Sequence, residues 1–172
     1  MTTTLTTNRE DHLIAWLAAL AITIHLIEAA LPSPVPGIKP GLANVVTVAA
    51  LMLFGWRVAA WVSLLRVLVG SLFAGTFLSP TFALSLSGAA GALLILGLAS
   101  SLPGVRFGAL GYCILAAMAH MTAQFFVAYS LFIHHPGLFT LLPVLMTAAV
   151  VFGALSGVLT QTALGSLKEP RP

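Results

Sequence analysis

Six apolar runs, separated by short polar or proline-containing segments, cover most of this 172-residue chain. Only seven Lys and Arg residues and four Asp and Glu residues are present, whereas about 25% of a typical soluble domain is charged. The runs do not alternate between apolar and polar residues as the strands of a membrane barrel do. Helices satisfy their own backbone hydrogen bonds in lipid. We therefore predict an all-α integral membrane protein.

The runs predict six transmembrane helices in one domain, residues 13–165, with a tail at each end, residues 1–12 and 166–172. The second run is short compared with the roughly 20 residues that a spanning helix needs. A single cysteine, Cys113, excludes an internal disulfide and is expected to be a buried small side chain. The predicted spans are Leu13–Leu31, Gly41–Phe54, Val58–Phe73, Thr81–Ser100, Phe107–Leu131 and Leu138–Leu164.

The positions of the cations predict the orientation, because short cytoplasmic loops are enriched in Lys and Arg. If the N-terminal tail is cytoplasmic, Lys39 is the one loop cation that falls outside. The inner side then holds Arg9, Arg57, Arg106, Lys168 and Arg171. We therefore predict a multi-pass protein of the cytoplasmic (inner) cell membrane with both tails in the cytoplasm.

The proline-rich segment from Leu31 to Asn44 must be irregular at its centre, because four of its residues are prolines and proline interrupts a helix. It connects the first two predicted spans, and charge counting places it outside. Lys39 lies within it. We expect this segment to act as the lid of a site.

Polar residues inside the spans indicate where that site lies, because such residues are costly in lipid and commonly mark a functional site. Their depths along the predicted helices place them in the outer half of the bundle. This asymmetry predicts a pocket that opens outward and takes a small anionic or amphipathic compound. The candidate substrate-binding residues are Glu28, Lys39, Asn44, Arg66, His120 and Gln124.

Each candidate has a structural alternative. The alternative role of Arg66 is to pair with Glu28. The alternative for Lys39 is that it is a solvated loop residue. His120 and Gln124 serve equally well as interhelical hydrogen-bonding groups. His25 and Glu28 have the spacing of half a metal site, but no second pair accompanies them. We therefore expect no metal site and no cofactor.

Small residues form a second pattern, since they let helices approach closely in a membrane. Gly153 and Gly157 are four residues apart in the last span, and internal packing is the expected reason. Ala15 and Ala19 have the same spacing in the first span. We expect these two alanines to dock a partner protein.

The runs IKPGLAN (residues 38–44) and LLRVLVGSLFAGTFLSP (residues 64–80) resemble the Gx transporter family, which is also labelled heptaprenyl diphosphate synthase component I. The resemblance covers residues 13 to 165. Members are similar in size and layout to the S components of energy-coupling factor (ECF) transporters. The resemblance implies that the loop between the first two helices closes over the substrate and that Ala15 and Ala19 contact the transport module.

The sequence lacks the motifs of a prenyl diphosphate synthase and of an ATPase. Prenyl diphosphate synthases hold Mg²⁺ through clustered aspartates, and this sequence has Asp11 alone. It also has no nucleotide-binding motif. We therefore expect a non-enzymatic subunit that works in the bilayer with ATPase and transmembrane coupling subunits and binds no nucleic acid. The alternative is a non-catalytic membrane accessory protein of isoprenoid or quinone biosynthesis.

Overall fold

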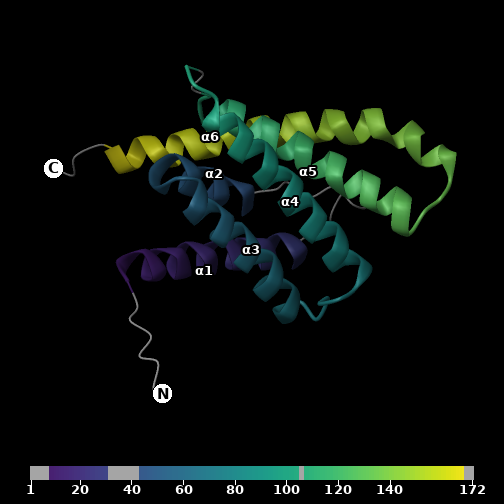
Figure 1. The fold of residues 1–172 in the computed structure, drawn as a ribbon, viewed down its shortest axis with the longest axis horizontal. Helices are drawn as coiled ribbons and strands as arrows, with labels where there is room; N and C mark the ends of the chain where they lie inside the picture. Colours follow the sequence, from purple (N-terminus) through teal and green to yellow (C-terminus); the bar gives the residue numbers. More distant parts are fainter. Residues whose placement is uncertain (1–7, 31–42, 105–106, 169–172) are drawn as a thin grey trace.

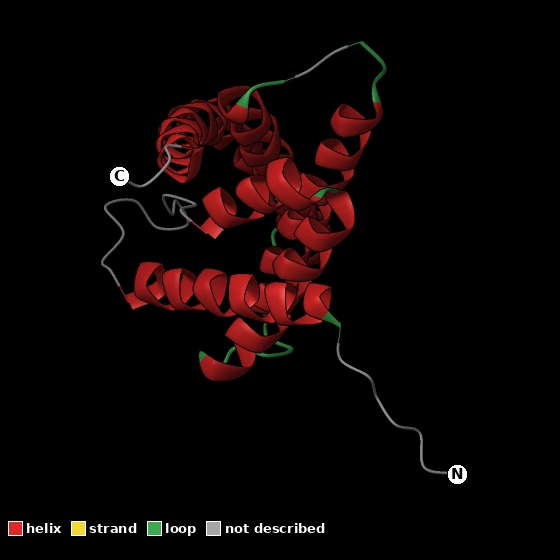
Figure 2. Cartoon of the chain, turned by 90° about the vertical axis from the view of Figure 1, so that its left-hand side faces the viewer, coloured by secondary structure: helices red, strands yellow, loops and turns green. Residues whose placement is uncertain are grey.

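The computed structural model describes residues 8–30, 43–104 and 107–168, and these residues form helices joined by short loops. Figure 2 shows no strand in this described part. The structure thus confirms the prediction of an all-helical protein with six α-helices. They are α1 (Arg9–Ala30), α2 (Ala43–Phe54), α3 (Trp56–Phe73), α4 (Pro80–Ser101), α5 (Ala109–Leu131) and α6 (Leu142–Lys168), with a 3₁₀ helix, η1 (Pro136–Leu141), before α6.

Five of the helices are long and apolar enough to cross a membrane, and they make the chain a multi-pass membrane protein. The exception is α2, which has 12 residues and is about 18 Å long at 1.5 Å per residue. The hydrocarbon core of a bilayer is about 30 Å thick. Taken alone, α2 is therefore too short to span it.

The first helix begins earlier than its apolar run predicts, at Arg9 instead of Leu13. Asn8 and Asp11 explain the difference by capping the helix. The Asn8 side-chain oxygen accepts a hydrogen bond from the Arg9 amide at 2.8 Å, and the Asp11 carboxylate accepts one from the Asn8 amide at 2.8 Å. These bonds satisfy amides that lack partners at a helix start.

Helices α2 and α3 are separated by one residue, where a three-residue turn, Gly55–Arg57, was expected. Gly55 has a φ of 90°, a left-handed conformation that glycine adopts without steric cost. Helix α4 begins at Pro80, directly after Ser79, whose hydroxyl accepts a hydrogen bond from the Phe82 amide at 3.3 Å. Serine followed by proline is a common helix start.

The short helix α2 lies at the centre of the bundle and contacts α1, α3, α5 and α6. Its side chains Val46, Val48, Ala50 and Leu51 are buried in the main apolar core. In Figure 1, α1, α3 and α5 begin toward the left of the molecule, whereas α4 and α6 begin at the right. The start of α1 and the end of α6 thus lie at the same end of the bundle.

Glycines allow α6 to pack closely on α5, as the Gly153 and Gly157 spacing predicted. A Cβ added at Gly153 would lie 3.0 Å from the Ala117 Cβ, and one at Gly157 would lie 2.6 Å from the Leu110 Cα. Real Cβ atoms do not approach a backbone atom to within 2.6 Å. Internal packing is therefore the role of this pair.

Trp56 links the start of α3 to α4 by a hydrogen bond. Its indole N–H donates a hydrogen bond to the Leu93 carbonyl at 3.2 Å. We expect Trp56→Phe to lower the free energy of unfolding by about 0.5–1.5 kcal/mol, because the ring is kept and one hydrogen bond is lost. Thermal unfolding in detergent measures this change. Trp61→Phe, at a similarly exposed tryptophan of α3, is the matched control, and an equal effect of both substitutions would contradict the role of the bond.

Candidate ligand-binding cavity

All six helices contribute to one cavity of about 320 Å³. Its lining includes residues near the end of α1, in the first turns of α2 and α4 and in the first half of α6, and it extends to Cys113 near the start of α5. Its volume is at the small end of the range of about 300–1,000 Å³ for small-molecule sites. The lining side chains are His25, Glu28, Asn44, Arg66, Val67, Thr81, Leu84, Ser85, Cys113, Ala117, His120, Met121, Gln124, Ala148, Ala149, Phe152, Gly153 and Ser156.

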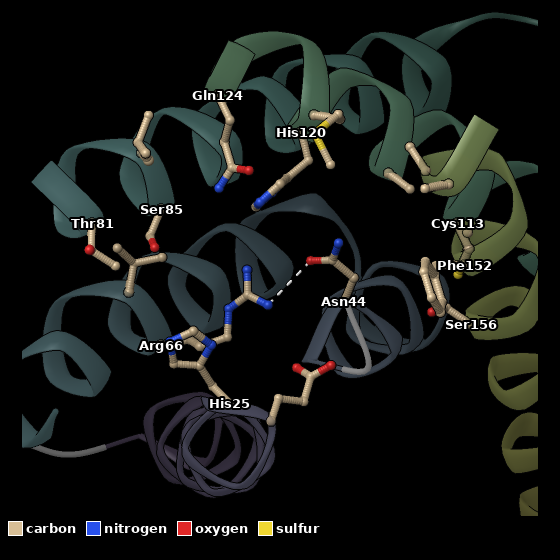
Figure 3. Close-up of a pocket in the computed structure, with 18 residues that line it drawn as sticks. His25, Asn44, Arg66, Thr81, Ser85, Cys113, His120, Gln124, Phe152 and Ser156 are labelled. Atoms are coloured by element: carbon tan, nitrogen blue, oxygen red, sulfur yellow. Dashed lines mark hydrogen bonds between the residues drawn. The ribbon is translucent and has the colours of Figure 1, made fainter. Parts of the chain in front are cut away.

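The cavity brings together most of the residues that the sequence indicated. Glu28, Asn44, Arg66, His120 and Gln124 come from four helices and all line it. Figure 3 shows His120 and Gln124 pointing from α5 toward Arg66 and Asn44. The sixth candidate, Lys39, and the expected lid around it lie outside the described residues.

Arg66 is the central charged group of the cavity. Its side chain is buried, with 5% of its surface exposed, and one terminal N–H donates to the Asn44 side-chain oxygen at 3.2 Å (Figure 3). The Nε atom has no hydrogen-bond partner, although a guanidinium offers five N–H donors. Glu28 acts on Arg66 electrostatically from α1. Arg66 therefore lines the cavity with Glu28 as an electrostatic neighbour, and its role as a ligand contact stays a prediction.

His120 depends on a glycine of α4 for its position. A Cβ added at Gly88 would lie 2.5–2.7 Å from three atoms of the His120 ring, including Nε2 at 2.5 Å. The Nδ1 atom of His120 is buried and has no hydrogen-bond partner. Arg66 and His25 are its electrostatic neighbours. Because glycine has no Cβ, Gly88 leaves the space that the His120 imidazole occupies beside the cavity.

The sequence did not assign several other polar lining residues to the site. His25, considered above only as half of a metal site, lines the cavity and packs on α3. A Cβ added at Gly70 would lie 3.2 Å from the His25 Cδ2. Thr81 and Ser85 are four residues apart on α4, and this same-face spacing is the signal that would have found them. Cys113 and Ser156 also line the cavity.

Ala15 and Ala19 lie elsewhere, on an exposed face of α1. Both line an open apolar groove of about 470 Å³ between α1 and α3, opposite Leu65, Val69 and Phe73. In a membrane, such a groove faces lipid or another protein. The docking of a partner by these alanines stays a prediction.

We expect Gly88→Ala to displace the His120 ring and to reduce the ligand that copurifies with the protein, while the helices still assemble. The added methyl group overlaps the end of a side chain, which can move, and not the backbone. Quantitative mass spectrometry of extracts from equal amounts of folded protein measures the loss. Gly108→Ala is the control, because a Cβ there meets nothing within 4 Å. Equal retention by both variants would argue against a ligand role for His120.

Five long apolar helices and a cavity lined by both polar and apolar side chains define the class of this chain: a multi-pass membrane protein with a candidate small-molecule site. The family model for heptaprenyl diphosphate synthase component I matches residues 17–163. The chain therefore belongs to the heptaprenyl diphosphate synthase component I family. No curated protein and no solved structure matches the chain.

Proposed function

We propose that this protein is the membrane substrate-binding subunit of a transporter, similar to an ECF S component, and that it captures a small anionic or amphipathic compound from outside the cell. The observation that supports this proposal is the convergence of Glu28, Asn44, Arg66, His120 and Gln124 on one cavity of about 320 Å³. Polar and charged side chains are expensive inside a membrane and commonly mark a substrate pathway.

The orientation proposed from the loop cations makes this cavity open toward the outside. Both tails are then cytoplasmic, and the protein lies in the inner membrane with α2 completing a six-helix bundle. The exposed ion pair between Arg57 and Glu10, at 3.8 Å, lies on the proposed cytoplasmic side, where it adds little stability. A ligand enters from outside, and reorientation of the bundle delivers it inward.

ATP-driven transport requires partners, because the sequence has no nucleotide-binding motif. We propose an ATPase pair and a transmembrane coupling subunit as these partners. The groove lined by Ala15 and Ala19 supports a docking role for α1, since small residues let a partner helix approach closely. In this proposal the protein itself performs no catalysis.

The family description favours a second candidate, a non-catalytic membrane accessory protein of isoprenoid or quinone biosynthesis. In that role the chain works with a separate catalytic prenyltransferase. The two candidates differ in the proteins that they bind.

Affinity purification of the full-length protein from its own membranes separates the two candidates. We expect an ATPase pair and a membrane coupling subunit to copurify, and the double variant Ala15→Leu, Ala19→Leu to lose them. Ala90→Leu, at another exposed alanine on α4, is the control and should keep them. Copurification of a soluble prenyltransferase in place of the ATPases would contradict the transport role.

A further inference from the structure

The polar end of the cavity offers hydrogen-bond donors that the protein itself leaves unused. Arg66 is more than nine-tenths buried and points into the cavity in Figure 3. Among the described residues, Arg66 donates a hydrogen bond to Asn44, and its Nε atom has no partner there. An unmatched buried donor carries a free-energy cost that a bound acceptor removes. A ligand group that accepts hydrogen bonds, such as a carboxylate, fits this position.

The charges around the cavity limit how much negative charge that group carries. Among the described lining residues, Arg66 is the one Lys or Arg side chain, and Glu28 already places a carboxylate in the same cavity. The other ionisable side chains among the described lining residues are His25, His120 and the Cys113 thiol. Like charges repel strongly in a poorly solvated site. A phosphate or diphosphate therefore fits less well than a group with one negative charge.

Another part of the cavity is largely apolar, with the small polar side chains Cys113 and Ser156 beside Phe152 (Figure 3). Ala117 and Met121 of α5 and Ala148, Ala149 and Phe152 of α6 line it. In Figure 3, Phe152 lies across the cavity from Thr81 and Ser85. Burial of hydrocarbon against this wall is favourable by the hydrophobic effect when a ligand arrives from water.

We infer that the ligand is a small amphipathic monoanion, whose carboxylate-type head is bound by Arg66 and whose apolar body lies against α5 and α6. This inference rests on the proposed function, because it assigns a ligand class to the same cavity. It narrows that class by disfavouring simple inorganic anions, which leave the apolar wall uncovered, and prenyl diphosphates, whose charge the described lining residues do not balance.

The test compares octanoate, octanamide, octyl phosphate, acetate and geranyl diphosphate as ligands of the full-length protein in lipid nanodiscs. A ligand that binds the folded state raises the temperature of unfolding. We expect octanoate to bind about tenfold or more tightly than octanamide, since its charge strengthens the hydrogen bonds to Arg66. We expect acetate and the two phosphorylated probes to bind more weakly than octanoate. Arg66→Met should remove the preference for octanoate over octanamide.

A second measurement locates the probe. Cys113 is the single cysteine of the sequence and lines the cavity, so octanoate should slow its alkylation by N-ethylmaleimide. Stronger stabilisation by octyl phosphate or geranyl diphosphate would overturn the inference, as would equal binding of octanoate and octanamide. A wild-type protein that responds to no probe would also overturn it. The proposed transport function is tested separately by copurification and would survive these results.

Discussion

Replacing Arg66 with methionine is expected to weaken the binding of octanoate by about 30- to 4,000-fold. The loss of one partner from a buried, hydrogen-bonded charge pair costs about 2–5 kcal/mol, and each 1.4 kcal/mol corresponds to a factor of ten. Methionine fills much of the same space without a charge. Removal of one partner of a buried charge pair also lowers stability, and Glu28 is a buried electrostatic neighbour of Arg66, so affinity is compared only on variant protein that is shown to be folded. The concentration dependence of the unfolding temperature in nanodiscs gives the affinity.

Two further substitutions control this result. Arg66→Lys keeps the charge but loses the planar donor geometry, so its affinity should lie between those of the wild type and Arg66→Met. Arg57→Met removes the other cation of α3, which is exposed and pairs with Glu10 at 3.8 Å, and should bind octanoate like the wild type. Wild-type affinity in a folded Arg66→Met protein would show that Arg66 does not contact the ligand.

The second large effect is expected at the contact between α5 and α6. A Cβ at Gly157 would lie 2.6 Å from the Leu110 Cα and 3.3 Å from the Leu110 backbone nitrogen. Because these atoms belong to the backbone, α6 itself must move to admit a side chain. We expect Gly157→Ala to cost about 1–3 kcal/mol of stability, as overpacking does in protein cores. Gly157→Leu should prevent the accumulation of folded protein in the membrane.

Gly165→Ala is the matched control, because this glycine also lies on α6 and a Cβ there meets nothing within 4 Å. Its unfolding temperature in detergent should equal or exceed that of the wild type, since alanine favours helix more than glycine does. If Gly157→Ala were as stable as Gly165→Ala, the close approach of α6 to Leu110 would not contribute to folding.

The polar part of the site could be predicted from the sequence because its residues are polar or charged within apolar runs. Arg66 and Glu28 are charged side chains within apolar runs, and such a conflict indicates function without any knowledge of the fold. Successive spanning helices also alternate in direction, so depth along each run could be compared. Glu28, Asn44, Arg66, His120 and Gln124 were placed in one region by this comparison, and the structure places them around one cavity.

The rest of the cavity depends on which face each helix turns inward, and the sequence carries little information about this. Apolar residues occur on every face of these helices, so Ala148 or Phe152 on the cavity side looks no different from Val151 on an exposed side. Cys113 and Ser156 are small side chains that fit core, lipid or cavity equally well. The contact of His25 with Gly70 could not be predicted, because the two residues are far apart in sequence.

The ends of the helices were harder to predict than their existence. Hydropathy locates the apolar part of a helix, but capping side chains decide where it begins. Asn8 and Asp11 extend α1 into a polar segment that was predicted to be a tail. The break between α2 and α3, in contrast, consists of one residue, Gly55, in a left-handed conformation.

Native mass spectrometry of the protein released from its own membrane tests most directly whether the cavity is a ligand site. We predict that the wild-type protein carries one small molecule per chain and that Arg66→Met, equally folded, carries none. The bound molecule should contain one anionic group and an apolar portion. An empty wild-type protein, or the same molecule retained equally by Arg66→Met, would contradict a ligand site built around Arg66.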